Sequence, residues 1–136
     1  MADVELRGLT PEGWQRGAGF SHGMSSRGGR HLSIAGQTAH ENGSGVVSDD
    51  LAAQWDQSLG NVVAVVEAAG GGAQHVAELT VFVTSMSEYH ESGAALVEPW
   101  RRHFGKHFPA ITLIGVTALI EERAKIEIKG TAFIPE

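Results

Sequence analysis

The sequence contains no cysteine, and lysine and arginine together number only 10, against 16 aspartate and glutamate residues. Without cysteine the chain can form no disulfide and cannot use a thiol as a nucleophile. Nucleic-acid binding requires clustered basic side chains that neutralise phosphates, whereas this chain has a net charge of −6. We therefore expect no nucleic-acid partner.

Long apolar runs are also missing. No segment approaches the roughly 20 apolar residues of a membrane helix, and no basic stretch followed by an apolar core opens the chain. We therefore expect a cytoplasmic protein without membrane contact. The apolar share of 42% is enough for one hydrophobic core. We expect a single domain over residues 1–136, in which residues 1–18 form an N-terminal arm or loop.

The N-terminal segment carries β-strand patterns separated by glycines. We expect a short strand near residues 4–9, followed by strands at residues 20–26 and 31–35. The sequence Arg27-Gly28-Gly29-Arg30 lies between the last two strands, and consecutive glycines supply the positive φ values of a tight turn. This pattern predicts a hairpin.

A helix follows. Apolar side chains recur every three or four positions between residues 51 and 69, which is the spacing of one helical face. Ser48 or Asp49 is the expected N-cap, because a short polar side chain there can accept a bond from a free backbone N–H. The three glycines at residues 70–72 end the helix.

The next segment predicts a strand at residues 76–84 and a second helix. Ser85 and Glu88 have the spacing of a capping box at the start of that helix. Pro99 interrupts the helical pattern, and an interior proline costs about 3 kcal/mol, so we expect a kink or break near Glu98. Gly105 ends the helix.

Two β-rich segments complete the chain. The first, residues 110–116, is nearly all apolar, as expected of a strand buried on both faces. In the second, Ile126 and Ile128 alternate with Glu127 and Lys129, so the charged pair shares one strand face. After the arm, the predicted order of elements is therefore β-β-α-β-α-β-β.

This order predicts an α+β fold, because the crossovers place both helices on one face of a mixed sheet. The other face of the sheet would stay bare and largely apolar. Soluble monomers rarely expose such a large apolar patch. We therefore expect an oligomer that covers this face.

Several segments, in order and spacing, resemble the Rid family of reactive-intermediate deaminases, also called YjgF-like proteins and, in older usage, endoribonucleases L-PSP. The similarity runs from about residue 19 to the C-terminus and rests on Ala35-Gly36-Gln37, Gln54–Gly70, Leu79–Thr84, Phe108-Pro109-Ala110 and Ile126-Glu127-Ile128. The resemblance implies a chorismate-mutase-like two-layer sandwich that assembles as a homotrimer. It also implies that small molecules bind in clefts between subunits.

The resemblance implies a set of site residues, several of which depart from the family's pattern. Its substrate-binding positions correspond to Phe20, Ala35, Gly36, Ile111, Thr112 and Leu113. Deaminating Rid enzymes have an arginine at the position of Ile111, where it holds the substrate carboxylate with its planar fork. Phe20, Ala35 and Leu113 stand where the family often has tyrosine, serine and cysteine. The site is thus more apolar, which disfavours the usual 2-imino acid substrates.

Two residues are candidates for catalysis. The resemblance implies that Glu127 holds and activates a hydrolytic water. The alternative is a surface-strand glutamate that accompanies Lys129. His22 lies two positions after Phe20, hence on the same face of an extended segment, where an imidazole could act as acid, base or donor. A purely structural histidine is the alternative.

No metal or cofactor is expected. His103 and His107 have i, i+4 spacing, but Gly105 breaks the helix between them, so they do not form a metal-binding pair. The glycines at 70–72 follow a helix and precede a strand, which is the reverse of the order in a phosphate-binding loop.

Three functions are compared. The first is a small-molecule enzyme that hydrolyses or tautomerises an imine or enamine, with Glu127 positioning water and backbone N–H groups near Gly36 and Thr112 binding the substrate oxygen. The second is a trimer that binds a metabolite without chemistry, which the loss of polar site residues favours. The third is a ribonuclease, which the acidic charge disfavours.

Overall fold

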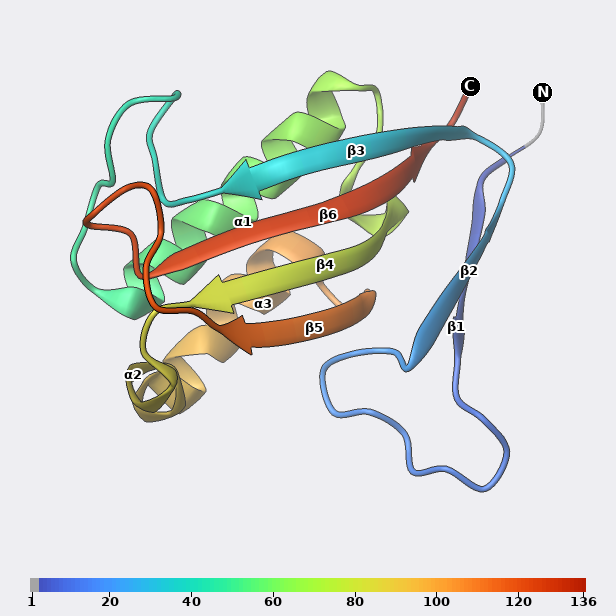
Figure 1. Cartoon of the computed structure of the whole chain (residues 1–136). Helices are drawn as coiled ribbons and strands as arrows, with labels where there is room; N and C mark the ends of the chain where they lie inside the picture. Colours follow the sequence, from blue (N-terminus) through green and yellow to red (C-terminus); the bar gives the residue numbers. More distant parts are fainter. Residues whose placement is uncertain (1–2) are drawn as a thin grey trace.

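The computed structural model describes residues 3–136 and forms two layers, a mixed sheet and a set of helices on one of its faces (Figure 1). The sheet has four strands in the order β3 (Arg30–Gln37), β6 (Ile126–Ile134), β4 (Val76–Val83) and β5 (Ala110–Gly115). β4 and β5 run parallel, and β6 is antiparallel to both β3 and β4. This arrangement confirms the predicted α+β fold.

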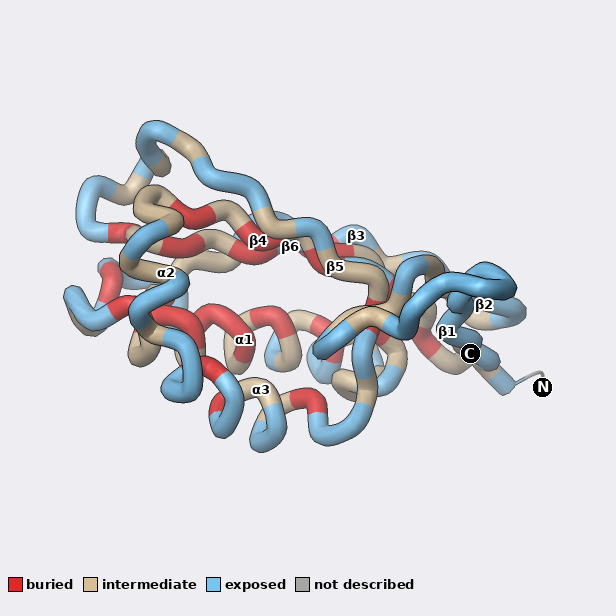
Figure 2. The backbone as a smooth tube through the Cα atoms, turned by 90° about the horizontal axis from the view of Figure 1, so that it is seen from below, coloured by how far each residue is buried: buried red, intermediate tan, exposed pale blue. Residues whose placement is uncertain are grey.

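The core lies between the sheet and α1 (Leu51–Ala68), where Figure 2 shows the buried residues concentrated. Every second residue of β6 is buried there, namely Ile126, Ile128, Gly130, Ala132 and Ile134. The residues between them, including Glu127 and Lys129, lie on the opposite face of the sheet, as predicted. No helix of residues 3–136 covers that face (Figures 1 and 2).

The N-cap of α1 is Asp50, so the expectation of Ser48 or Asp49 is wrong. The Asp50 carboxylate accepts a hydrogen bond from the N–H of Ala53 at 3.0 Å, and Asp50 is the last residue with extended dihedral angles before the helix. The Ser48 hydroxyl instead accepts a bond from the N–H of Asp50 at 3.1 Å. At the other end, Gly70 has a φ of +98°, which turns the chain out of the helix.

The second helical segment is divided into α2 (Met86–Ser92), a 3₁₀ helix (Gly93–Leu96) and α3 (Val97–Phe104). The predicted cap is confirmed, because the Ser85 hydroxyl accepts a bond from the N–H of Glu88. The expected break is present but begins earlier than Glu98: the α-helical conformation stops at Gly93, whose φ is +33°, and resumes at Val97. Pro99 is the third residue of α3 and so lies in its first turn. A backbone N–H in the first turn would have no intrahelical acceptor, so proline, which lacks this N–H, is tolerated there. Among residues 3–136, none of the helices is long and apolar enough to cross a membrane.

The N-terminal strands form a separate ribbon. β1 (Glu5–Leu9) confirms the strand expected near residues 4–9 and pairs with β2 (Gly23–Arg27), beyond the end of the main sheet (Figure 1). The predicted hairpin between β2 and β3 is wrong. Gly28 and Gly29, both with φ of +78°, turn the chain away from β2 and into the main sheet, where β3 pairs with β6. Residues 1 and 2 of the predicted arm lie outside the described residues.

Candidate functional site

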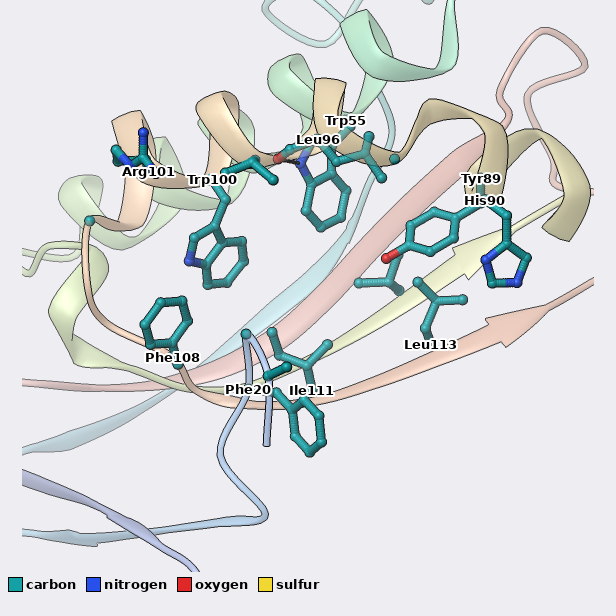
Figure 3. A pocket seen from close by; sticks show the side chains of 16 residues that line it. Phe20, Trp55, Tyr89, His90, Leu96, Trp100, Arg101, Phe108, Ile111 and Leu113 are labelled. Atoms are coloured by element: carbon teal, nitrogen blue, oxygen red, sulfur yellow. Dashed lines mark hydrogen bonds between the residues drawn. The ribbon is translucent and has the colours of Figure 1, made fainter. Parts of the chain in front are cut away.

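A cavity of about 590 Å³ lies between the helical layer and the edge strand β5 (Figure 3). The side chains that dominate its wall are apolar or aromatic: Phe20, Trp55, Tyr89, Leu96, Trp100, Phe108, Ile111 and Leu113. Arg101 and His90 also border the cavity, but both are exposed. The volume lies within the usual range of small-molecule sites.

Two predicted site residues, Ile111 and Leu113, form the sheet side of this cavity. In the parallel pairing of β4 and β5, Ile111 is opposite Leu79 and Leu113 is opposite Val81. Leu79 and Val81 belong to the buried core, and side chains opposite one another share a sheet face, so Ile111 and Leu113 point toward the helices. The wall at Ile111 therefore offers no charge to a ligand.

Phe20 reaches the cavity from the loop before β2, so residues 20–22 are not part of a strand, contrary to the prediction. Ser21 attaches this loop to the start of β5. Its N–H donates to the carbonyl of Pro109 at 3.0 Å, and its hydroxyl donates to the carbonyl of Phe108 at 2.6 Å. These bonds place Phe20 beside Ile111 (Figure 3).

Four aromatic residues of the cavity wall were not predicted as site residues: Trp55, Tyr89, Trp100 and Phe108. The Nε1–H of Trp55 donates to the carbonyl of Leu96 at 3.0 Å, which fixes its ring. Burial raises the pKa of the Tyr89 hydroxyl above its usual value, so the phenol stays neutral. Helical spacing predicts that Trp55, Tyr89 and Trp100 face the sheet, and Phe108 follows α3 in the loop before β5. Neither feature reveals the open space beside these rings.

Glu127 lies on the other face of the sheet, against Gly36 of β3. The register of β3 and β6 shifts between Ile34 and Gln37, so Ala35 and Gly36 together oppose Lys129 in a β-bulge. The bulge brings the Gly36 backbone so close to Glu127 that a Cβ at Gly36 would overlap its carboxylate. Glycine is therefore the residue that lets the carboxylate lie on the backbone here.

His22 does not line the large cavity. It borders a second cavity of about 200 Å³ beside β4 and β5, together with Glu78, Thr80 and Thr112. Its Nε2 lies 3.0 Å from the carbonyl of Gln15, and its ring makes edge contacts with Phe20 and Trp14 at centroid distances of 5.2 Å. These contacts connect His22 to the N-terminal loop, and a catalytic role for its imidazole stays a prediction.

The predicted site residues thus divide into two groups within one chain. Phe20, Ile111 and Leu113 line the large cavity on the helical side. Glu127, Thr112 and Gly36 lie on the uncovered side of the sheet. Phe20, Ile111 and Thr112 also border the second cavity with His22. Leu113 and Glu127, however, lie on opposite faces of the sheet and do not meet within a single chain.

His103 and His107, the pair with i, i+4 spacing, each contact other parts of the fold. His103 Nε2 lies 2.7 Å from Asp56 of α1, and Arg102 holds the same carboxylate with two bonds of 2.9 and 3.0 Å. His107 Nε2 lies 2.7 Å from the carbonyl of Val76. Within residues 3–136, no group of three or more histidine, aspartate or glutamate side chains is arranged to hold a metal ion.

Comparison with known proteins identifies the family of this chain. A family model described as endoribonuclease L-PSP matches residues 15–134. The chain belongs to the Rid family. Among curated Rid proteins, the 2-iminobutanoate/2-iminopropanoate deaminase of Salmonella typhimurium is 34% identical over 107 residues, which cover 76% of this chain and 80% of the relative. A RutC family protein of Pyrococcus horikoshii is 30% identical over 113 residues, with 82% and 86% covered.

Solved structures of Rid proteins have the same fold. The crystal structure of YyfB, a Rid family protein of unknown function from Yersinia pestis, matches with a TM-score of 0.85 at 33% identity and covers 95% of this chain and 98% of YyfB. The YjgF gene product of E. coli matches with a TM-score of 0.66 at 32% identity, with 84% and 87% covered. The Rid family predicted from the sequence is therefore confirmed.

Proposed function

We propose that this Rid protein hydrolyses or tautomerises an imine or enamine that carries no carboxylate. The observation that supports this proposal most directly is the place of Ile111. Its side chain forms the wall of the large cavity at the position where the family resemblance implies a carboxylate-binding arginine. Because an aliphatic side chain cannot pair with a carboxylate, the cavity favours a neutral substrate over a 2-imino acid.

Assembly into a homotrimer would bring the two groups of site residues together. The uncovered sheet face carries Phe82 and Phe133, which are half-buried, and Ile114, which is 41% exposed. Covering these side chains with a second copy removes apolar surface from water. In the proposed trimer, Glu127 of one subunit faces the large cavity of its neighbour, and the site lies in the cleft between them.

The proposed hydrolysis needs one carboxylate and one water. Glu127 takes a proton from the water while the water oxygen bonds to the carbon of the C=N group, and the nitrogen gains a proton. The resulting carbinolamine then loses ammonia as its C–N bond breaks, which leaves a carbonyl. One imine and one water thus give one carbonyl compound and one ammonia, without an oxidant or reductant. An enamine would first take a proton at carbon to become the imine.

The role of Glu127 is tested with neutral imines generated in situ by an amine oxidase and trapped with semicarbazide. The wild-type protein should accelerate loss of the imine, and Glu127→Gln should reduce that rate by about 100-fold or more, the usual contribution of general acid–base catalysis. The matched control is Glu122→Gln on the exposed loop before β6. Full activity of Glu127→Gln would remove the glutamate from the mechanism.

A second candidate is a trimer that binds a metabolite without changing it. It is favoured by the apolar residues at positions 20, 35, 111 and 113, which leave few polar groups to act on a substrate. The discriminating measurement is recovery of the ligand: a compound that raises the melting temperature and is recovered unchanged supports binding alone. Ribonuclease activity is the least favoured reading, and absence of RNA binding at low salt would exclude it.

A further inference from the structure

The aromatic rings at one end of the large cavity are stacked with nearly parallel planes. Trp100 is in the centre of this stack: its plane makes angles of 12° with Phe104, 7° with Phe108 and 23° with Trp55. Trp100 and Phe104 are in close contact, with ring centroids 4.4 Å apart. Parallel rings present flat faces, and flat faces favour flat ligands because offset stacking is the preferred contact.

Part of this stack remains open to a ligand. The Trp100 and Phe108 centroids are 6.2 Å apart, so the two rings do not cover one another fully. Both residues line the cavity, and Phe108 is 37% exposed. Figure 3 shows the two rings on one side of the cavity and Ile111 and Phe20 on another. The open faces thus border a space with apolar walls.

Polar side chains are few on the cavity wall: Tyr89 and His90 lie at the end away from the stack, whereas Arg101 lies near Trp100 (Figure 3). The Tyr89 hydroxyl points into the cavity (Figure 3), and burial raises its pKa, so it is a neutral hydrogen-bond donor. The Arg101 side chain is 70% exposed and lies 3.5 Å from Glu98. A ligand that fits these walls has a flat apolar body and one polar group near Tyr89.

We propose that the substrate is a planar, uncharged aromatic imine or enamine of one or two rings. Its ring stacks on Trp100 and Phe108, and its nitrogen, or the oxygen of the product, accepts a hydrogen bond from Tyr89. The reaction in this inference rests on the proposed function, whereas the preference for a flat aromatic ligand does not. The cavity volume of about 590 Å³ accommodates such a molecule.

Binding is measured first, with two unreactive ketones of the same carbon skeleton, acetophenone with a flat aromatic ring and 1-cyclohexylethanone with a puckered saturated ring. Titration by calorimetry on the assembled wild-type protein should give a dissociation constant at least about fivefold lower for acetophenone, as stacking on two rings implies. Equal affinity, tighter binding of the cyclohexyl ketone, or no binding of either would overturn the proposal. Trp100→Leu should reduce the preference to about twofold or less, whereas Ile120→Ala, at a fully exposed residue, should leave it unchanged.

Turnover separates this inference from the proposed function. A flavin amine oxidase converts benzylamine and cyclohexylmethylamine to the two corresponding neutral imines, whose loss is followed by semicarbazide trapping with catalase present. If acetophenone binds preferentially but neither hydrolysis is accelerated, the preference for aromatic ligands is supported and the proposed enzymatic activity is rejected. If both hydrolyses are accelerated equally and the two ketones bind with equal affinity, the proposed imine hydrolysis is supported and the preference for an aromatic substrate is rejected. Faster hydrolysis of the aromatic imine together with tighter acetophenone binding supports both.

Discussion

The carboxylate of Glu127 lies on the backbone of Gly36, at a β-bulge where two residues of β3 oppose one residue of β6. A Cβ at Gly36 would overlap the carboxylate, although the overlapped atoms are at the end of a flexible side chain. Gly36→Ala should therefore displace Glu127 while leaving the fold intact. We expect at least a tenfold loss of kcat for a neutral imine, with a melting temperature close to that of the wild type.

The matched control for this substitution is Gly45→Ala, because a Cβ at Gly45 meets no atom within 4 Å. That variant should retain full kcat. If Gly36→Ala also retained full kcat, the position of the carboxylate against Gly36 would have no part in catalysis.

The identity of the side chain at position 111 should determine the charge of the substrate. Arginine at this position would place a guanidinium in the cavity wall, where it can form two hydrogen bonds to a carboxylate. Ile111→Arg should raise kcat/KM for 2-imino acids by roughly tenfold or more and lower kcat/KM for neutral imines. The 2-imino acids are generated by an amino-acid oxidase.

Ile111→Met is the control, since methionine is long and flexible but uncharged. It should not gain activity on 2-imino acids. The prediction fails if both variants keep the wild-type preference, because the wall at position 111 would then not contact the substrate.

The two cavity tryptophans should differ in their contribution to stability. Trp55 donates a hydrogen bond to the carbonyl of Leu96, whereas within residues 3–136 the buried Nε1–H of Trp100 has no acceptor in reach. Trp55→Phe should lower the free energy of unfolding by about 1–3 kcal/mol more than Trp100→Phe does, because it leaves the Leu96 carbonyl without a partner. Urea unfolding of both variants measures the difference, and equal losses would contradict this account.

The Asp56 carboxylate connects α1 to α3 and should make stability depend on acid pH. Hydrogen bonds from Arg102 and His103 hold the pKa of Asp56 below its usual value. A carboxyl group with a lowered folded-state pKa stabilises the fold above its unfolded pKa, and this contribution is lost as the pH falls through the folded value. Asp56→Asn should therefore cost about 1 kcal/mol near pH 7 and progressively less below pH ~4.

Asp49→Asn is the matched control for Asp56. Asp49 also contacts an arginine, Arg123, at 3.1 Å, but its side chain is 77% exposed. Exposed ion pairs contribute little, so the stability loss should be smaller than for Asp56→Asn. A loss at Asp56 that stays constant from pH 7 to pH 3 would show that its charge is not responsible.

Much of the fold follows from periodicity in the sequence. The alternation around Glu127 fixes which face of β6 is buried, and the three- and four-residue steps fix the inner face of α1. The predicted hairpin failed because two consecutive glycines suit a tight turn as well as a change of direction between sheets. Pro99 was expected to lie inside a helix, where proline is unfavourable, but it lies in the first turn of α3, where proline is tolerated.

The candidate site was only partly predictable. Family resemblance identified the positions of Ile111 and Glu127, but the opposite orientation of the two side chains depends on the register of β5 against β4 and of β6 against β4. The sequence also marked Trp55 and Trp100 as inward-facing without revealing the space beside them. Cavities arise where packing between distant elements is incomplete, and no local pattern encodes this.

In the proposed trimer, Glu127 of one subunit acts on a substrate held in the cavity of its neighbour. This arrangement is tested most directly by mixing two inactive variants, Glu127→Gln and Leu113→Trp, of which the second fills the cavity. In a mixed trimer, the intact glutamate of one variant meets the intact cavity of the other. In trimers assembled at random from a 1:1 mixture, a site is intact when its cavity comes from Glu127→Gln and its glutamate from Leu113→Trp. Each condition holds with a chance of one half, so about a quarter of the wild-type activity should be restored.

Each variant alone should stay nearly inactive after the same unfolding and refolding procedure, and native mass spectrometry should confirm that the mixed sample contains trimers of both variants. Recovery of about a quarter of the wild-type rate on a neutral imine is the predicted result. Mixed trimers with no more activity than the separate variants would contradict the account, because the glutamate and the cavity would then not cooperate between subunits.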